Sequence, residues 1–454
     1  MSEYQSLTLQ AFWADEWHDA ADVVFSEPEL GLLSNNIRIS YRSGYVDKAL
    51  DLRPLPAGEH LELFDERALS INLPASFLGD YIGSDVVAFL RDIIPQGAGR
   101  RHLARVLGYP ENIEQSADIP LLREGCITPI GNLRIREAAE SFQQRLETSE
   151  ARGFSADEIN NRADELIEHA RYLHLAIGSA SGVGGDAPKL MLTEAEDGLF
   201  YMEGTCSDSQ AVRHWIIKFA RGRRNQRDQD VLRGEAAVYQ ALAQTHIRSI
   251  EKAHLAEGEH GPALWLLRFD RRTGDSSRVQ RLGMESIYSL MGMLGDGAAL
   301  SHNQVARKLM ERFRDDSMLV DYLLNDLINE AIGNRDNHGR NTAFLKDEGH
   351  FRMAPAFDLA PMVLDPEGIS RSSAWDGDWR AGPRGNYPAI LDSLAMDAKS
   401  ARHQMEQALN SARDLRNRLA GHGAPSAMLD HQGVRLELVD TVINELAGAP
   451  DAQS

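Results

Sequence analysis

One stretch of the chain constrains the fold more than any other: a buried helix that runs directly into a polar loop. Apolar residues recur at helical spacing between Asp321 and Ile332, which predicts a buried amphipathic helix. Gly333 follows at once, where a left-handed helix cap is expected. Seven of the nine residues in 333–341 are polar or charged. Such a loop beside a core is costly without a purpose, so it is the first candidate for a functional site.

The loop contains an aspartate and an asparagine whose separation in sequence matches a known catalytic motif. Asp336 and Asn341 are five positions apart, and protein kinases have the same D-x-x-x-x-N separation in their catalytic loop. There the aspartate accepts the proton of the substrate hydroxyl and the asparagine oxygen binds magnesium. A single match of this kind is common by chance and usually marks solvated loop residues. The similarity predicts Asp336 as the catalytic base and Asn341 as a metal ligand.

The segment after the loop adds a second acidic group. Residues 342–358 are predicted to form a hairpin that turns near Gly349. A hairpin returns its second strand to the start of the first, so Asp358 is expected beside Asn341. Two hard oxygen ligands at one end of a ribbon suit magnesium. In kinases an aspartate at this place holds the metal that bridges the nucleotide phosphates. This combination is much rarer than the loop motif alone, and it favours a functional site.

A histidine lies between the two loop residues. The side chain of His338 could donate to the loop backbone, bind a carboxylate or be exposed. We favour a role in organising the loop, because Asp336 already supplies a base. His338 also counts among the candidate cofactor-binding residues.

A glycine-rich segment precedes these motifs. Residues 177–190 contain four glycines, which let backbone N–H groups approach phosphates closely. The segment does not match the ordinary P-loop pattern, and a plain flexible turn is about as common an explanation. The candidate nucleotide-binding residues here are Gly182, Val183, Gly184 and Gly185.

A lysine lies in the middle of an apolar strand. The run His214–Phe219 is predicted to be a short strand, and Lys218 within it is costly to bury unless it is paired. In kinases this lysine binds the nucleotide phosphates and pairs with a helix glutamate. Glu235, at the start of a candidate helix, is the predicted partner. The alternative is an edge-strand lysine that faces water. A further strand ends near Phe269, where a two-lobed kinase has the hinge that binds adenine.

The order of elements along the chain indicates an α+β fold with two lobes, resembling the layout of kinases. The chain has 454 residues, too many for one ordinary core. Residues 1–146 mix strands and helices, residues 147–280 are strand-rich after a bridging helical segment, and residues 281–454 are mostly helical. Leu69–Pro74 alternates and then stops at a proline, which predicts an edge strand.

The charge and the termini limit the function classes. The formal net charge is −20, so direct binding of this chain to nucleic-acid phosphates is not expected. The two cysteines, Cys126 and Cys206, are not in a zinc-binding spacing. We see neither a signal peptide nor an apolar run long enough for a membrane span. These observations predict a cytoplasmic protein.

Together the motifs resemble the HipA family of toxin kinases over nearly the whole chain. The most specific is the string N-x-D-x-H-x-x-N, from Asn334 to Asn341. The other matching segments are Leu69–Pro74, Ile94–Gly97, Gly125–Gly131, Ser179–Gly182, Pro188–Lys189, Arg268–Arg271 and Phe357–Pro361.

This resemblance implies a type II toxin-antitoxin kinase that uses ATP and magnesium. Such proteins phosphorylate serine or threonine on protein targets, with aminoacyl-tRNA synthetases the known class, and they stop translation and growth, a state linked to persistence. A HipB-type helix-turn-helix antitoxin commonly holds them, so contact with DNA is indirect. Ser179 and Ser181 are the implied autophosphorylation sites, and Lys189 is an implied nucleotide contact. The insertion 183–187 lengthens the family's usual loop and leaves open which serine is modified.

Two other functions remain open on the sequence alone. A small-molecule or lipid kinase on the same scaffold would have the same loop residues. A catalytically silent module that binds the antitoxin and acts as a co-repressor would need none of Lys218, Asp336, Asn341 and Asp358. The presence of all four favours an enzyme.

Overall fold

The computed structural model describes most of the chain and divides it into two compact units. The described residues are 4–51, 63–77, 79–109, 117–148, 151–173, 189–220, 225–273, 278–295, 297–365, 368 and 370–448. The first unit comprises Met1–Ile217, Asp270–Asp296 and Phe344–Phe351. The second unit comprises Lys218–Phe269, Gly297–Ala343 and Arg352–Ser454. The three-part division after residues 146 and 280 stays a prediction.

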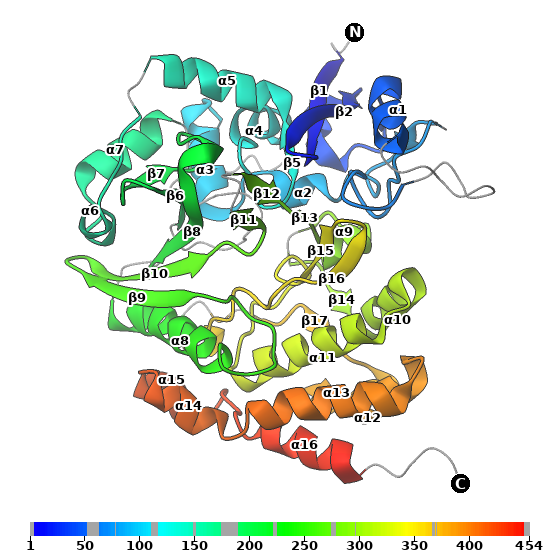
Figure 1. The fold of residues 1–454 in the computed structure, drawn as a ribbon. Helices are drawn as coiled ribbons and strands as arrows, with labels where there is room; N and C mark the ends of the chain where they lie inside the picture. Colours follow the sequence, from blue (N-terminus) through cyan, green and yellow to red (C-terminus); the bar gives the residue numbers. More distant parts are fainter. Residues whose placement is uncertain are drawn as a thin grey trace. The chain divides into compact units, whose positions relative to one another are not determined.

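The first unit opens with a five-stranded antiparallel sheet in the order β4-β3-β2-β1-β5. Figure 1 labels β1, β2 and β5 of this sheet. Ala14 and Asp15 connect β1 to β2 with φ values of 50° and 65°, a turn whose twist matches that of the strands. Every residue of β1 from Leu7 to Trp13 is buried, so this strand is covered on both faces. The strands are β1 (Gln5–Trp13), β2 (Glu16–Phe25), β3 (Ile37–Tyr41), β4 (Tyr81–Ile82) and β5 (Leu133–Ile135).

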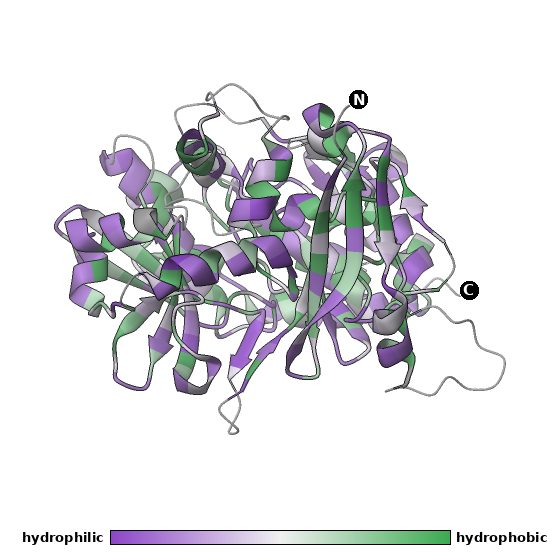
Figure 2. Cartoon of the chain, turned by 90° about the horizontal axis from the view of Figure 1, so that it is seen from above, coloured by the Kyte–Doolittle hydropathy of each residue, from purple (hydrophilic) through white to green (hydrophobic). Residues whose placement is uncertain are grey.

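Helices and shorter strands complete the first unit, and Figure 2 shows helices with hydrophobic and hydrophilic residues on different sides. The helices are η1 (Pro28–Leu33), α1 (Ser43–Asp51), α2 (Leu90–Ile93), α3 (Gly97–Val106), α4 (Asp118–Gly125), α5 (Arg136–Glu147), α6 (Ala156–Asn160), α7 (Asp164–Tyr172), η2 (Asp208–Gln210) and α9 (Ile287–Leu290). The further strands are β6 (Lys189–Ala195), β7 (Phe200–Met202), β11 (Arg271–Thr273), β12 (Val279–Arg281) and β13 (Gly283–Ser286). Three strands have residues in both units: β8 (Ala211–Phe219), β15 (Ala343–Asp347) and β16 (His350–Met353).

The edge strand predicted for Leu69–Pro74 is wrong. The backbone turns there, and the N–H of Leu73 donates to the carbonyl of Ser70 over 3.0 Å. The Glu285 carboxylate accepts from the Ser70 hydroxyl over 2.5 Å and from the Ile71 N–H over 2.9 Å. A buried carboxylate needs such donors. The partner lies more than two hundred residues away in sequence, so a local pattern could not reveal it.

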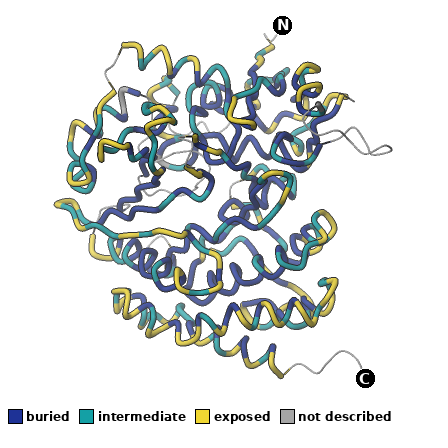
Figure 3. The backbone as a smooth tube through the Cα atoms, viewed as in Figure 1, coloured by how far each residue is buried: buried dark blue, intermediate teal, exposed yellow. Residues whose placement is uncertain are grey.

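The second unit is mostly helical around α11, which is buried over nearly its whole length (Figure 3). Asp315 caps this helix by accepting from the N–H of Ser317 over 2.8 Å. α11 packs against α10, α13 and α16. The helices are α8 (Gln226–Leu242), α10 (His302–Phe313), α11 (Asp316–Ala331), η3 (Met362–Leu364), η4 (Gly377–Trp379), α12 (Tyr387–Leu394), α13 (Ala398–Ser411), α14 (Leu415–Gly421), α15 (Ser426–Leu429) and α16 (Leu438–Gly448). The strands are β9 (Ala253–Gly258), β10 (Gly261–Leu267), β14 (Leu300–Ser301), β17 (Ser373–Ala374), β18 (Arg380–Ala381) and β19 (Arg384–Gly385). Among the described helices, none has the length and apolar character needed to cross a bilayer.

The buried side chain of His302 should make the stability of the second unit depend on pH. His302 stacks on Trp375 and lies 2.6 Å from the Tyr322 hydroxyl. Burial lowers the pKa of His302 from 6.5 to about 4, although Asp326 opposes the shift. The unfolded chain takes up this proton below pH 6.5 and the folded chain does not. The free energy of unfolding should therefore fall between pH 6.5 and 4, by at most about 3 kcal/mol from this group.

Chemical denaturation of wild type and His302→Phe at several pH values measures this contribution. The phenyl ring keeps the stacking and cannot take up a proton. We expect a shallower pH dependence in the variant over this range. Equal slopes in the two proteins would show that His302 does not couple folding to pH.

Candidate functional site

The polar loop begins where α11 ends, at a glycine that no other residue could replace without strain. Gly333 has a φ of 71°, and a Cβ built on it would lie 2.8 Å from both the Gly433 carbonyl oxygen and a Val363 methyl. The N–H of Asn334 donates to the carbonyl of Asn329 over 2.8 Å, which closes a Schellman-type cap. The left-handed cap predicted at Gly333 is thus confirmed, and it fixes the direction in which the loop leaves the helix.

Asn334 ties the loop to the segment that carries Asp358. Its side-chain oxygen accepts from the N–H of Asp336 over 3.1 Å. Its Nδ2 donates to the Asn329 side chain over 2.7 Å and to the backbone carbonyl of Asp358 over 2.9 Å. Asn334 is itself buried. The two carboxyl-bearing residues that the sequence predicts for one site are therefore joined through a single side chain.

Asn341 closes the loop and has one unsatisfied atom. Its Nδ2 donates to the Asp336 carbonyl over 2.9 Å. Its Oδ1 is buried, and it accepts no hydrogen bond from any described residue. A buried acceptor without a donor is costly. A divalent cation would satisfy this oxygen, so the donor set of Asn341 and Asp358 fits the magnesium site that the sequence predicts.

The predicted hairpin is present and turns where expected. Glu348 and Gly349 form the turn, with φ values of 49° and 81°. At its base the N–H of Ala354 donates to the carbonyl of Ala343 over 2.9 Å. Asp358 follows with a φ of 58°, a left-handed conformation that is uncommon outside glycine. The Asn334 contact to its carbonyl helps to hold this backbone, and such conformations gather at functional sites.

Lys218 is buried and paired, so the alternative of an edge lysine facing water is wrong. Its Nζ lies 2.5 Å from the Glu235 carboxylate and also contacts the Asp358 carboxylate. Burial alone would lower the pKa of Lys218, but the charges of Asp358 and Glu235 outweigh it and the pKa is raised. Tyr239 donates to Glu235 over 3.1 Å and accepts from the N–H of Leu359 over 3.3 Å. One ammonium thus joins β8, α8 and the residue after the hairpin.

His338 lies within the loop and contacts its backbone. Its N–H donates to the Asp336 carbonyl, and its carbonyl accepts from the N–H of Asn341, both over 2.9 Å. Its Nδ1 accepts from the N–H of Arg340 over 3.3 Å. These contacts match the loop-organising role favoured from the sequence, whereas a contact of His338 with a cofactor stays a prediction.

The remaining predicted residues fall into two groups. Phe269 stacks on Phe357, with ring centroids 5.5 Å apart, and so lies next to the residue that precedes Asp358. Lys189 is buried at the start of β6 in the first unit. The glycine-rich segment and both candidate serines lie outside the described residues: Ser179, Ser181, Gly182, Val183, Gly184 and Gly185.

The sequence reasoning missed two asparagines on α11. Asn329 donates to the side chain of Asn325 over 2.7 Å, and Asn325 donates to the Thr342 hydroxyl over 3.2 Å. This chain connects the loop at Asn334 with the start of the hairpin. The available signal was a pair of asparagines, four positions apart, on a helix whose apolar spacing predicts burial.

Comparisons with known proteins match a family model and a number of solved structures, two of which are given below. The family model described as HipA-like C-terminal domain matches residues 181–417. The HipA protein of Shewanella oneidensis MR-1, solved with HipB and its operator DNA, is 16% identical, with a TM-score of 0.60 over 96% of this chain and 99% of that chain. The Helicobacter pylori proinflammatory kinase CtkA is 14% identical, with a TM-score of 0.31 over 52% of this chain and 90% of that chain. That score is too low to support a conclusion. No curated protein sequence matches.

Proposed function

Because this chain belongs to the family defined by the HipA-like C-terminal domain, we propose that it is an ATP- and magnesium-dependent protein kinase. The family resemblance and the α+β, HipA-like fold class predicted from the sequence are both confirmed. The proposed enzyme transfers the γ-phosphoryl group of ATP to a serine or threonine hydroxyl. In this proposal Asp336 is the base, Lys218 and Glu235 orient the phosphates, and Asn341 and Asp358 bind magnesium.

One observation carries the proposal: a continuous set of contacts that links all the charged residues. Glu235 and Asp358 share the Lys218 ammonium, and Asn334 joins Asp358 to Asp336. The three charges of Lys218, Glu235 and Asp358 lie in one mostly buried cluster, which is expensive unless they act together. Asn334 fixes the backbone of Asp336 to the backbone of Asp358. A catalytically silent module gains nothing from such an arrangement.

The proposed reaction is an in-line phosphoryl transfer. Asp336 accepts the proton of the hydroxyl as its oxygen forms the new bond to the γ-phosphorus. The bond between the γ-phosphorus and the oxygen bridging to the β-phosphate breaks, and ADP leaves with that electron pair. Lys218 donates to phosphate oxygens while Glu235 keeps its ammonium in place. Magnesium bound at Asn341 and Asp358 would neutralise charge on the β- and γ-phosphates.

The biological role follows from the family and is proposed with it. We place the chain in a type II toxin-antitoxin system in the cytoplasm, where a HipB-type antitoxin restrains it and provides the contact with DNA. The Shewanella structure contains HipA together with HipB and operator DNA, which supports such a partner. An aminoacyl-tRNA synthetase is the proposed target. Ser179 or Ser181 is the proposed site of self-modification.

The proposed magnesium-binding role of Asn341 is tested by measuring how the transfer of labelled phosphate depends on the magnesium concentration. Purified protein incubated with γ-labelled ATP should incorporate label only when magnesium is present. Asn341→Ala removes the unsatisfied oxygen, so half-maximal labelling should need at least roughly tenfold more magnesium, the lower end of the loss when even a residue that supports a metal ligand is removed. Mass spectrometry of the labelled protein locates the modified residue.

The matched control is another buried asparagine in the second unit. Asn303 contacts the Asp376 backbone through both side-chain atoms and is unrelated to the loop. Asn303→Ala should keep the magnesium dependence of the wild type. Absence of label from wild type, with no ATP binding in a calorimeter, would contradict the proposed function.

A further inference from the structure

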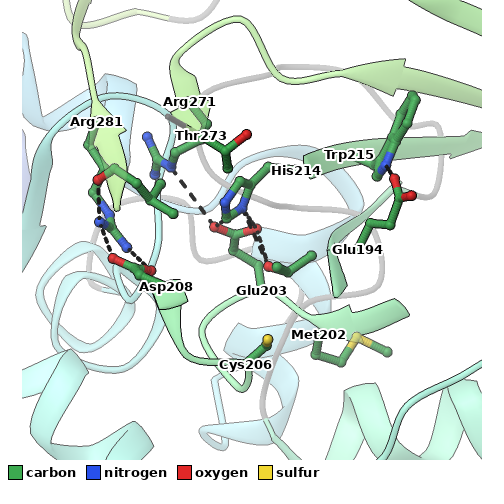
Figure 4. A network of polar contacts seen from close by, with 12 residues as sticks. Glu194, Met202, Glu203, Cys206, Asp208, His214, Trp215, Arg271, Thr273 and Arg281 are labelled. Carbon is green, nitrogen blue, oxygen red and sulfur yellow. Dashed lines mark hydrogen bonds and ion pairs between the residues drawn. The ribbon is translucent and has the colours of Figure 1, made fainter. Parts of the chain in front are cut away.

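The first unit contains a cavity that the proposed kinase does not use. Its volume is about 360 Å³, within the size range of small-molecule sites. It lies among β2, β5, α5, the loop from Gly204 to Asp208, and the strands β11 and β12. Figure 4 shows four of the residues that line it, Cys206, Asp208, Arg271 and Arg281. The lining joins an apolar wall of α5 to three arginines.

Two of these arginines are already neutralised. Arg281 makes a bidentate pair with Asp208, at 2.7 and 2.8 Å (Figure 4). Arg271 is buried, pairs with Asp270 over 2.6 Å and donates to the carbonyls of Gly131 and Pro129. Neither guanidinium needs a further anion.

The third arginine of the lining, Arg134, is not neutralised in this way. Its guanidinium lies 4.0 Å from the centre of the Trp17 ring, and its Nε donates to Gln10 over 2.7 Å. Among the described residues, no carboxylate lies within ion-pair distance of it. Burial, and next the charge of Arg281, lower the pKa of Arg134 to about 10. The two terminal nitrogens, which carry four N–H donors, form no hydrogen bond with the described residues.

The rest of the lining supplies a place for an apolar body. An apolar wall is formed by Ile127, Phe142 and Leu146. Polar groups are added by the side chains of Thr128 and Gln143. A planar guanidinium with free N–H donors binds carboxylates and phosphates through paired hydrogen bonds. We propose that this cavity binds a small organic anion, whose carboxylate or phosphate contacts Arg134 and whose apolar body lies against the α5 wall.

Calorimetric titration of the full chain with matched probes tests the site. Benzoate and phenyl phosphate carry the two candidate anionic groups on one ring, and benzamide is the neutral control. At least one anion should bind with a dissociation constant near 1 mM or below, on the order of the affinity expected for so few contacts. Binding of benzoate alone assigns a carboxylate ligand, and binding of phenyl phosphate alone assigns a phosphate ester.

Variants show whether Arg134 carries the binding. Arg134→Met should weaken the anion at least about tenfold, the effect of one lost charged hydrogen-bond pair, whereas Arg134→Lys should retain much of the affinity. Arg38→Met is the matched control, because Arg38 is a half-exposed arginine of β3, in the same sheet, paired with Asp80. Circular dichroism confirms that each variant is folded.

Three results would overturn the inference: no saturable binding of either anion, equal binding of benzamide, or equal affinity in Arg134→Met. Displacement of the probe by ADP with magnesium would also overturn it, because the ligand would then occupy the nucleotide site. The test therefore does not depend on the kinase proposal.

Discussion

Asp336→Asn should reduce label transfer from ATP by about 10²- to 10⁴-fold, the usual loss when a general base is removed. Asparagine keeps the size and the backbone contacts of the loop, and it cannot accept the hydroxyl proton. Nucleotide binding should be almost unchanged, because Lys218 and Asp358 remain. The rate of labelling at saturating ATP and the ATP affinity by calorimetry measure the two quantities separately.

Asp376→Asn is the control for this substitution. Asp376 is exposed in the second unit and contacts Asn303 through its backbone alone, so its variant should label at the wild-type rate. If Asp336→Asn labelled as fast as wild type, another group would have to accept the proton, and the loop would lose its proposed role.

Lys218→Met should both abolish phosphoryl transfer and destabilise the fold. Methionine has a similar length without a charge, so Glu235 and Asp358 would be left as unpaired carboxylates in a buried place. Breaking one side of a buried ion pair typically costs about 3–5 kcal/mol of folding free energy. Urea denaturation followed by tryptophan fluorescence measures this loss.

A second substitution separates lost charge from lost packing. In the Lys218→Met background, Glu235→Gln removes one uncompensated charge and can still accept from Tyr239. The double variant should therefore be more stable than Lys218→Met alone, which is a coupling that a double-mutant cycle resolves. If the double variant were even less stable than Lys218→Met, Lys218 would not stabilise the fold by compensating the charge of these carboxylates.

Local sequence patterns predicted the parts of the site that depend on nearby residues. The glycine cap at Gly333, the turn at Gly349 and the pairing of Lys218 with Glu235 each follow from a helix end, a hairpin or a buried charge. The turn at Ser70 could not be predicted in this way, because its carboxylate partner Glu285 is remote in sequence.

The cavity around Arg134 could be predicted from local sequence patterns even less. Its walls come from strands and a helix whose residues range from Trp17 to Arg281, and no motif marks them. Whether an arginine is neutralised depends on which carboxylates the fold brings near it. Only three-dimensional contacts separate Arg134 from its neighbours Arg271 and Arg281.

The shared ammonium of Lys218 has a consequence for the order of events at the site. In this structure it holds the Asp358 carboxylate, the group proposed to bind a divalent ion. Under the proposed function, an ion bound at these oxygens would release the lysine toward incoming phosphates. Phosphates bound to the lysine would release the carboxylate toward the ion. Each of the two proposed ligands would then raise the affinity of the other by the same factor. Nucleotide without the metal ion should therefore bind weakly, and a strong chelator should stop the reaction.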